Sequence, residues 1–292
     1  MLVSNMKNQH SNHLLLLLLA TLFISTSGAL GKFIDMPTPV IIWWRSIIAM
    51  VLLYGFCRFK RISLKISSKK HIPKTIISGL FMAAHWITYF YALKLSNVAI
   101  GMLSLFTYPI ITTLLEPIFI KVKFDPIYII LGFMVLFGMY ILVPEFNLEN
   151  THVKGILFGL LSALFYALRN ILSKKLVAHY HSSSIMLYQL FVITIVLLPV
   201  MFFLETSGIK TQYPYVILLA VFTTAIGHTM LVNSLNHFTV STASIISSTQ
   251  PILGIIIAFI FLNEIPTVNT FIGGSIILAT VVIESIRSRK IN

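Results

Sequence analysis

Charged residues are scarce in this sequence. Only 10% of its 292 residues are Asp, Glu, Lys or Arg, whereas soluble globular domains contain about a quarter. Hydrophobic residues make up 57% of the chain, and its mean hydropathy is +0.93. This composition excludes a soluble globular domain and favours an integral membrane protein.

Cysteine and basic-aromatic clusters are also missing. The single cysteine, Cys57, excludes an intrachain disulfide framework. The net charge of +13 is of a size found in nucleic-acid-binding proteins. The aromatic residues that can stack on bases, however, lie inside the apolar runs rather than among the lysines, so we expect no nucleic-acid partner.

The motifs of common catalytic and cofactor sites are absent. Gly31-Lys32 is followed by Phe33 and lacks the upstream glycine of a phosphate-binding loop. There is no His-Glu-x-x-His, no Cys/His cluster and no Gly-x-Ser-x-Gly. We therefore expect no enzyme, no catalytic residue, no cofactor and no metal site. Any transport is then driven by an ion gradient, by exchange or by the gradient of the solute itself.

Long apolar runs are what the sequence has in abundance. A helix of about 20 residues spans a hydrocarbon core of roughly 30 Å. Ten runs approach or reach that length: residues 14–34, 39–58, 74–95, 97–120, 126–143, 154–176, 183–204, 214–236, 239–262 and 267–285. The breaks between them contain turn-forming prolines, as at Asp35–Pro39, Phe124–Pro126, Pro144 and Pro266. The sequence predicts an all-α membrane protein of ten transmembrane helices.

The second half of the chain repeats the first at a constant offset of 142 residues. This offset places Lys32 on Lys174 and Pro109 on Pro251. The two copies cover residues 14–143 and 154–285. Because each copy has five runs, an odd number, the second enters the membrane in the opposite sense. Such inverted repeats place a substrate site near the bilayer midplane and rock about it.

The first apolar run has a second interpretation. Residues 1–24 share features with a cleaved signal peptide, namely a positive charge followed by a short leucine-rich run. The run 14–34 also matches the run that begins near Ile156 in the second copy. We interpret it as a retained first helix.

Positive charges lie mostly on one side of the predicted membrane. With the N-terminus in the cytoplasm, fifteen of the 21 Lys and Arg fall on the inner side: Lys7, Arg58, Lys60, Arg61, Lys65, Lys69, Lys70, Lys74, Lys121, Lys123, Lys174, Lys175, Arg287, Arg289 and Lys290. This bias predicts a multi-pass protein of the cell membrane with both termini in the cytoplasm. The basic stretch 58–74 is interpreted as a loop beside anionic membrane lipid.

A family resemblance rests on particular residues. Thr26–Lys32 (TSGALGK), followed by Pro39 and an Arg45-bearing second helix, resembles the opening of EamA-type members of the drug/metabolite transporter superfamily. Each copy also contains a helix of small residues with a proline at its middle, Pro109 or Pro251. The resemblance implies a bundle of ten helices in two inverted five-helix repeats. Such proteins usually export small metabolites, such as amino acids, or drugs.

The resemblance covers about residues 14–285 and departs from the family pattern in two places. The loop before the last helix reads Asn263-Glu264 where the family more often has Gly-Glu, although Gly273-Gly274 follows as expected. The corresponding loop of the first copy is Lys121-Val122 and contains no acid. The identity of the solute does not transfer, because the family carries many solutes.

Polar side chains inside the apolar runs are candidate substrate contacts, because they are costly when they face hydrocarbon. His85 and His228 lie near the middle of the third and eighth runs, with Trp86 and Tyr89 beside His85 on its helix. A central pair of imidazoles can carry a coupling proton. Alternatively, each is neutral and hydrogen-bonded to a neighbouring helix.

Two stripes of hydroxyl and amide residues precede the mid-run prolines. They consist of Ser104, Thr107 and Tyr108 in the fourth run, and of Ser244, Ser247, Ser248 and Gln250 in the ninth. A proline leaves a carbonyl one turn earlier without a donor, which makes that carbonyl a ligand acceptor or a flexing point. Two interpretations of these residues remain open: they contact the substrate, or they allow close packing of neighbouring helices.

The charged residues within or near the runs have two interpretations each. Arg45 lies about 9 Å from the outer end of its helix by helical rise and either attracts a carboxylate or snorkels to the surface. Arg169 is expected to snorkel at the inner end. Glu116 is a paired interfacial acid or a proton site, and Glu264 is expected to organise the outer loop and the start of the last helix. The small residues Gly155, Gly159 and Ala163 form a packing stripe.

These observations predict a secondary active transporter that exports a small metabolite, an amino acid or a related solute, by alternating access. Its cavity is expected between the first, third, fourth, sixth, eighth and ninth helices. The alternatives are a multidrug exporter of the same fold, a membrane enzyme acting on lipid through His85 and His228, and a membrane interaction protein that transports nothing. The expected partners are a small-molecule solute and membrane lipid, and the chain is a monomer or a homodimer.

Overall fold

The computed structural model describes residues 2–119, 126–142 and 149–291, and every regular element within these residues is helical. The first half contains α1 (Leu2–Phe33), α2 (Thr38–Phe59), η1 (Lys69–His71), α3 (Ile72–Leu95), α4 (Val98–Leu105), α5 (Tyr108–Phe119) and α6 (Ile127–Leu142). The second half contains α7 (Thr151–Val177), α8 (Ser182–Leu197), α9 (Val200–Phe203), α10 (Ile209–Leu218), the π-helix η2 (Leu219–His228), α11 (Thr229–Ser234), α12 (Val240–Ser247), α13 (Gln250–Leu262) and α14 (Val268–Ile291). The predicted loop residues Lys121, Lys123, Phe124, Asp125, Pro144 and Glu145 lie outside the described residues.

Eight stretches of the described chain are long and apolar enough to cross a membrane. Two shorter apolar helices, Ile129–Leu142 and Val268–Thr280, occupy the fifth and tenth predicted runs. Large apolar side chains on the outside of the bundle remain exposed, such as Phe133 and Phe137 on α6 and Phe259 on α13, because lipid rather than water is the expected neighbour. The all-α membrane class is confirmed, and the count of ten spans remains a prediction.

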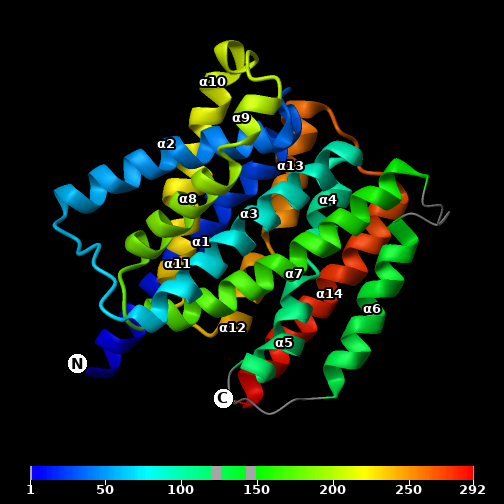
Figure 1. Cartoon of the computed structure of the whole chain (residues 1–292). Coiled ribbons are helices and arrows are strands. Elements are labelled where there is room, and N and C mark those ends of the chain that lie inside the picture. The colour runs from blue at the N-terminus through cyan, green and yellow to red at the C-terminus, as the bar shows by residue number, and fades with distance from the viewer. Residues whose placement is uncertain (1, 120–125, 143–148, 292) are drawn as a thin grey trace.

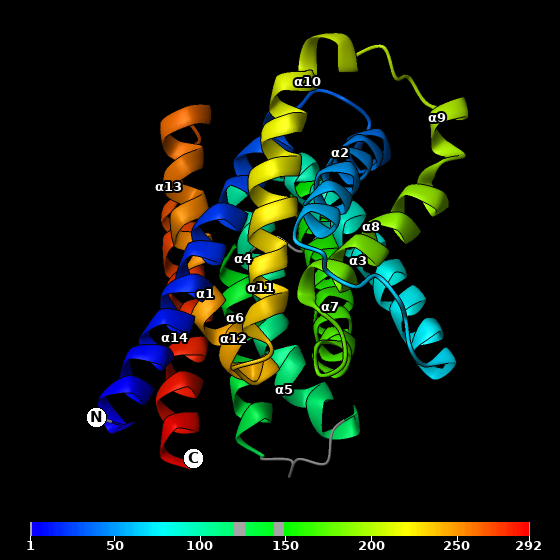
Figure 2. The same ribbon diagram turned by 90° about the vertical axis from the view of Figure 1, so that its left-hand side faces the viewer.

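Both chain termini lie at the same end of the bundle (Figures 1 and 2). We call this the terminal end and the opposite one the far end. α1 runs from the terminal end to the far end, whereas α7 begins at the far end and returns (Figure 1). The first helices of the two copies thus run in opposite directions, as expected for inverted repeats.

A lysine closes the far end of the bundle. The Lys32 ammonium, in the last turn of α1, donates to the carbonyl oxygens of Leu93 at 2.9 Å and Ser96 at 2.7 Å, where α3 ends. Helix ends leave carbonyls without intrahelical donors, and a positive charge there also complements the helix dipole. We call this arrangement the far clamp.

The same arrangement recurs at the terminal end. The Lys174 ammonium of α7 donates to the carbonyl oxygens of Leu235 at 2.6 Å and Phe238 at 3.0 Å, just after α11 ends. This donor and these two acceptors lie 142 residues after the corresponding atoms of the far clamp. This terminal clamp shows that the offset found in the sequence is an inverted structural repeat.

An acid from the other copy completes each clamp. At the far end, a Glu264 carboxylate oxygen accepts the backbone N–H of Val98 at 2.8 Å, at the start of α4, and Glu264 attracts Lys32. At the terminal end, Glu116 of α5 accepts the hydroxyl of Ser241 in the first turn of α12. Glu116 also attracts Lys174.

The role predicted for Glu264 at the start of the last helix is therefore wrong. Asn263 ends α13 in the left-handed conformation, with φ 54°. This residue reverses the chain, so that the next side chain reaches the start of α4 in the other copy. The predicted pairing of Glu116 at an end of the bundle is confirmed by its bond to Ser241.

The fourth and ninth runs are each broken in the middle. The helical run stops between α4 and α5 at Phe106-Thr107, and between α12 and α13 at Ser248-Thr249. Pro109 and Pro251 follow directly, and proline cannot donate the hydrogen bond that would continue a helix. The eighth run contains the π-helix η2 at its middle, a geometry often found at functional sites. Residues at all three irregularities, Leu105, His228 and Gln250, line one small cavity.

The glycine stripe of α7 packs closely against the first copy. A Cβ atom on Gly159 would lie 2.4 Å from the Cβ of Ser104, and one on Gly155 would lie 2.7 Å from the Cβ of Ser96. Ala163 is fully buried. The predicted packing role of this stripe is confirmed.

Candidate functional site

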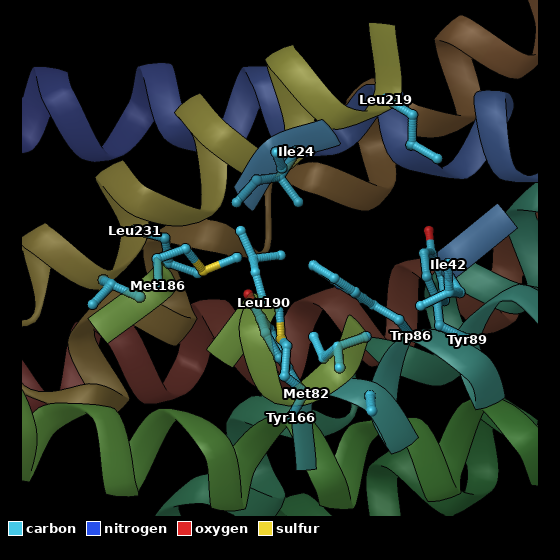
Figure 3. Close-up of a cluster of buried hydrophobic side chains, with 14 of the residues drawn as sticks. Ile24, Ile42, Met82, Trp86, Tyr89, Tyr166, Met186, Leu190, Leu219 and Leu231 are labelled. Carbon is cyan, nitrogen blue, oxygen red and sulfur yellow. The ribbon is translucent and has the colours of Figure 1, made fainter. Parts of the chain in front are cut away.

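Aromatic and polar side chains surround a small cavity at the centre of the bundle. Its volume is about 10 Å³, and it is lined by Ile24, Ser27, His85, Trp86, Tyr89, Leu105, Tyr166, His228 and Gln250. These residues come from α1, α3, α4, α7, η2 and α13, the six helices expected to line a cavity. Figure 3 shows Ile24, Trp86 and Tyr166 in this part of the core. The space is about what one water molecule requires, so the bundle is closed around it.

His85 is held firmly by a neighbouring helix. Its Nδ1 lies 2.7 Å from the Ser162 hydroxyl oxygen, and that hydroxyl donates to the His85 carbonyl at 2.9 Å. Because the hydroxyl has only one proton and donates it to the carbonyl, Nδ1 is the donor of the first bond. The ring also stacks on Tyr166, with centroids 4.3 Å apart. The environment of His85 fits the alternative of a neutral, structural imidazole.

His228 is buried at the same site but less constrained. Its ring centroid lies 5.4 Å from that of Trp86 and 6.2 Å from that of Tyr166. Its Nδ1 is buried and has no hydrogen-bond partner in the described chain. The structure thus brings the two predicted imidazoles into one cluster. Nδ1 of His85 is bonded to Ser162, whereas Nδ1 of His228 has no partner among the described residues.

Three of the other predicted contact residues, Trp86, Tyr89 and Gln250, line the central cavity. The side-chain Nε2 of Gln250 is buried without a partner among the described residues. Gln250 occupies this position because the break before α13 places the first residue of that helix at mid-depth. Tyr108 lies next to the cluster, 4.8 Å from Tyr166 between ring centroids, and donates to the Ser244 carbonyl at 3.4 Å.

Most of the predicted hydroxyl contacts satisfy their own helices instead. Ser104 donates to Ile100, Thr107 to the Ser104 carbonyl and Ser248 to the Ser244 carbonyl. None of these three lines the central cavity. Ser247 is fully buried and likewise does not line it. For Ser104, Thr107 and Ser248 the geometry agrees with close helix packing.

Arg45 does not snorkel to the surface. Its side chain is 0% exposed, and its guanidinium carbon lies 3.9 Å above the centroid of Trp86. Nε donates to Thr224 and Nη2 to Thr223, each at 2.9 Å. Nη1 is buried and has no partner within the described residues. This cation–π contact places the guanidinium against one wall of the cavity.

Arg169 contradicts the prediction that it snorkels. It is 0% exposed and donates from Nε and Nη2 to the Gln189 side-chain oxygen at 3.0 and 2.6 Å, and from Nη1 to Asn170 at 2.9 Å. The error arose because Gln189 of α8 supplies an acceptor inside the bundle, which makes the interior position more favourable than the surface.

Several residues of the site were not anticipated. Tyr166 and Ser27 line the cavity, Ser162 fixes His85, and Thr223 and Thr224 hold Arg45. The α7 residues had a detectable signal, because Ser162, Tyr166, Arg169, Asn170 and Ser173 follow helical spacing and form one polar face. The threonine pair had none, since its partner lies on a helix of the other copy.

A larger cavity opens at the terminal end. Its volume is about 480 Å³, and its polar lining consists of His13, His181, Ser182, Ser183, Thr229, Asn233, Ser234 and His237. His13 and His237 stack with ring centroids 3.5 Å apart. Burial, followed by the positive charges of the neighbouring His13 and Lys174, lowers the pKa of His237 and so favours its neutral form. Thr229 and Ala225 of this cavity flank His228 of the central cavity along the chain.

Comparison with known proteins agrees with this architecture. The EamA-like transporter family matches the chain in two segments, residues 12–143 and 153–286. The pseudopaline exporter CntI of Pseudomonas aeruginosa is 27% identical over 285 residues, which cover 94% of this chain and 96% of that protein. The S-adenosylmethionine uptake transporter of Rickettsia felis is 32% identical over 131 residues, 42% of this chain and 45% of that protein.

A solved crystal structure shares the fold. It superposes with a TM-score of 0.72 and covers 97% of this chain and 99% of its own, at 16% sequence identity. The named relatives are transporters, which supports a role in transport rather than catalysis. The resemblance expected from the sequence is thereby confirmed: this multi-pass membrane protein belongs to the EamA-like transporter family.

Proposed function

We propose that the protein is a secondary active transporter that exports small metabolites, amino acids or related solutes, across the cytoplasmic membrane by alternating access. Two inverted repeats, residues 14–143 and 154–285, rock about the central site in this proposal. The terminal end faces the cytoplasm, in keeping with the positive-inside rule. The named export activity of a relative aligned over most of the chain supports the direction.

The observation that carries the proposal is a set of unsatisfied polar atoms at the centre. Arg45 Nη1, His228 Nδ1 and Gln250 Nε2 are all buried without a hydrogen-bond partner in the described chain. Leaving one such group unsatisfied costs about 1–3 kcal/mol. His228 and Gln250 line the central cavity, and Arg45 stacks on Trp86, which is one of its walls. These three atoms, contributed by both repeats, are best explained by a polar solute that occupies the site during transport. Trp86, Tyr89 and Tyr166 supply the aromatic walls.

The terminal cavity is the proposed cytoplasmic entrance. It is wide enough for a small metabolite, at about 480 Å³, and is separated from the central cavity by the turn of η2 and α11 that carries His228 and Thr229. The hydroxyl of Thr229, which has no hydrogen-bond partner in the part of the chain that the structure describes, provides a polar group between the two cavities. Straightening of the π-helix is a natural way to connect them, because π-helices are local distortions of α-helices.

Proton coupling is assigned in this proposal to His228. Replacement of His228 by glutamine is expected to remove the pH dependence of export, because glutamine keeps a hydrogen-bonding group but cannot titrate. His85→Gln is the matched control: it should retain the pH dependence, because His85 is already committed to Ser162. Export rates measured at several external pH values test this. An unchanged pH profile in His228→Gln refutes the coupling and leaves transport itself standing.

The basic test of function is efflux. Cells that express the chain are loaded with amino acids or dipeptides, and intracellular pools are followed against cells with an empty vector. We expect at least one pool to fall faster, and purified protein in liposomes to move the same solute. If no pool changes and no solute moves in liposomes, the export proposal is wrong. Faster loss of drugs but not of metabolites would instead favour the multidrug alternative.

A further inference from the structure

In the part of the chain that the structure describes, the centre of the bundle contains positive charge without negative charge. Arg45 and Arg169 are both completely buried. Their hydrogen-bond partners are neutral: two threonine hydroxyls for Arg45, and the side chains of Gln189, Asn170 and Met186 for Arg169. Within the described residues no carboxylate bonds to either guanidinium.

The acidic side chains lie elsewhere. Of those the structure describes, Glu116 and Glu264 belong to the two clamps, and Asp35, Glu149 and Glu205 lie in connections between helices. An unpaired buried charge is strongly unfavourable, and an apolar side chain of similar volume would avoid that cost. Two such charges beside a substrate site indicate that the counter-charge arrives with the substrate.

The geometry of Arg45 fits a carboxylate in particular. Its planar guanidinium stacks on Trp86, a wall of the central cavity, and uses only Nε and Nη2 for the protein. Nη1 remains as a donor, and the Gln250 side chain, which lines the same cavity as Trp86, provides a second N–H group without a partner in the described chain. Guanidinium and amide donors together match the two oxygens of a carboxylate. The donors of Arg169 are bonded within the protein, so Arg169 attracts an anion only through its positive charge.

The site offers no comparable place for a cation. The lining consists of apolar, hydroxyl, imidazole and amide side chains, and no described acid faces it. The excess positive charge of a cationic solute would lie near two guanidinium groups without a carboxylate partner. The same cluster that attracts an anion therefore discriminates against basic amino acids and cationic drugs.

We infer that the transported solute is a small carboxylate with net negative charge, such as an acidic amino acid or a short dicarboxylic acid, and that Arg45 binds its carboxylate. This inference rests on the proposed transport function and deepens it. It separates anionic solutes from the neutral and basic amino acids that the proposed function also includes.

The test uses purified protein in liposomes loaded with glutamate, succinate, leucine or lysine as probes. We expect efflux of glutamate or succinate to exceed that of lysine by at least tenfold, with leucine between them. If lysine or leucine moves faster than both anions, the inference is overturned and the transport proposal stands. If none of the four moves and no other solute does, transport itself fails.

A second measurement examines Arg45 directly. The Arg45→Gln substitution should reduce the glutamate flux at least tenfold. It should also reduce the preference of the transporter for glutamate over glutamine. Arg45→Lys, which keeps the charge but not the planar fork, should lie between Arg45→Gln and wild type. Arg58→Gln, on the exposed end of α2, should behave as wild type. Thermal stabilisation of detergent-purified wild type by glutamate but not by lysine gives a readout independent of flux. An unaltered glutamate preference in Arg45→Gln would refute the assignment.

Discussion

Replacing Lys32 by methionine is expected to open the far end of the bundle, and replacing Lys174 by methionine is expected to open the terminal end. The two lysines are counterparts at the 142-residue offset, and each holds the chain where the third helix of its own repeat ends. In the proposed alternating-access cycle one end must release while the other holds. The two substitutions should therefore shift the equilibrium between the two open conformations in opposite directions.

The expected size follows from the hydrogen bonds that are lost. Each lysine is a charged donor to at least two backbone carbonyls at a helix end. Leaving such acceptors unsatisfied costs about 1–3 kcal/mol, which changes the ratio of two conformations by roughly 5- to 150-fold. Transport should slow in both variants, because each is held on one side of the cycle.

Cysteine labelling measures this bias. The single natural cysteine, Cys57, is replaced by serine, and Ser27 of the central cavity is replaced by cysteine. A membrane-impermeant thiol reagent should then label Lys32→Met faster from the far side, and Lys174→Met faster from the side of the termini. Lys154→Met is the matched control at the far end, where that side chain is exposed. Equal labelling of both lysine variants from both sides would contradict the prediction.

Replacing Gly159 by valine is expected to cause a large loss of folded protein. The new Cβ would lie 2.4 Å from the Cβ of Ser104, an atom fixed to the backbone of α4. Neither helix can yield by rotating a side chain, so α7 and α4 must separate. Overpacking of this kind costs about 1–3 kcal/mol, which corresponds to a decrease in Tm of several degrees, on the order of 10 °C at the upper limit.

Two further variants make the result specific. Gly55→Val serves as the control, since a Cβ on Gly55 meets nothing within 4 Å. Ser104→Gly combined with Gly159→Val should recover part of the lost stability, because it removes the atom that clashes. Thermal unfolding of the purified proteins in detergent measures all three. A stable Gly159→Val protein, or no recovery in the double variant, would show that the contact between α7 and α4 is not close.

Much of this arrangement is predictable from the sequence, because duplication leaves a signal that does not depend on any single motif. The constant offset that pairs Lys32 with Lys174 already implies opposite insertion of the two copies, and hence a central site bounded by six helices. His85, Trp86, His228 and Gln250 could be placed there, because depth along a membrane helix follows directly from residue count.

What could not be predicted concerns neighbours on other helices. Whether Arg169 reaches the surface or the interior depends on Gln189 of α8, and a residue count contains no information about that contact. The clamps could not be predicted from the sequence for a related reason: their acceptors are backbone carbonyls, which every residue has. The hydroxyl stripes were ambiguous because Ser104 and Thr107 have carbonyls of their own helix within reach.

The acids of the clamps have a consequence for how such a chain can be divided. Glu264 belongs to the second copy and serves the lysine of the first, whereas Glu116 belongs to the first copy and lies beside the lysine of the second. Neither half can complete its own closure. Produced as two separate polypeptides, the halves would need to insert with opposite orientations and find each other before either end could seal. A single half could achieve the same only by pairing with an upside-down copy of itself, so that the acid of each copy lay beside the lysine of the other.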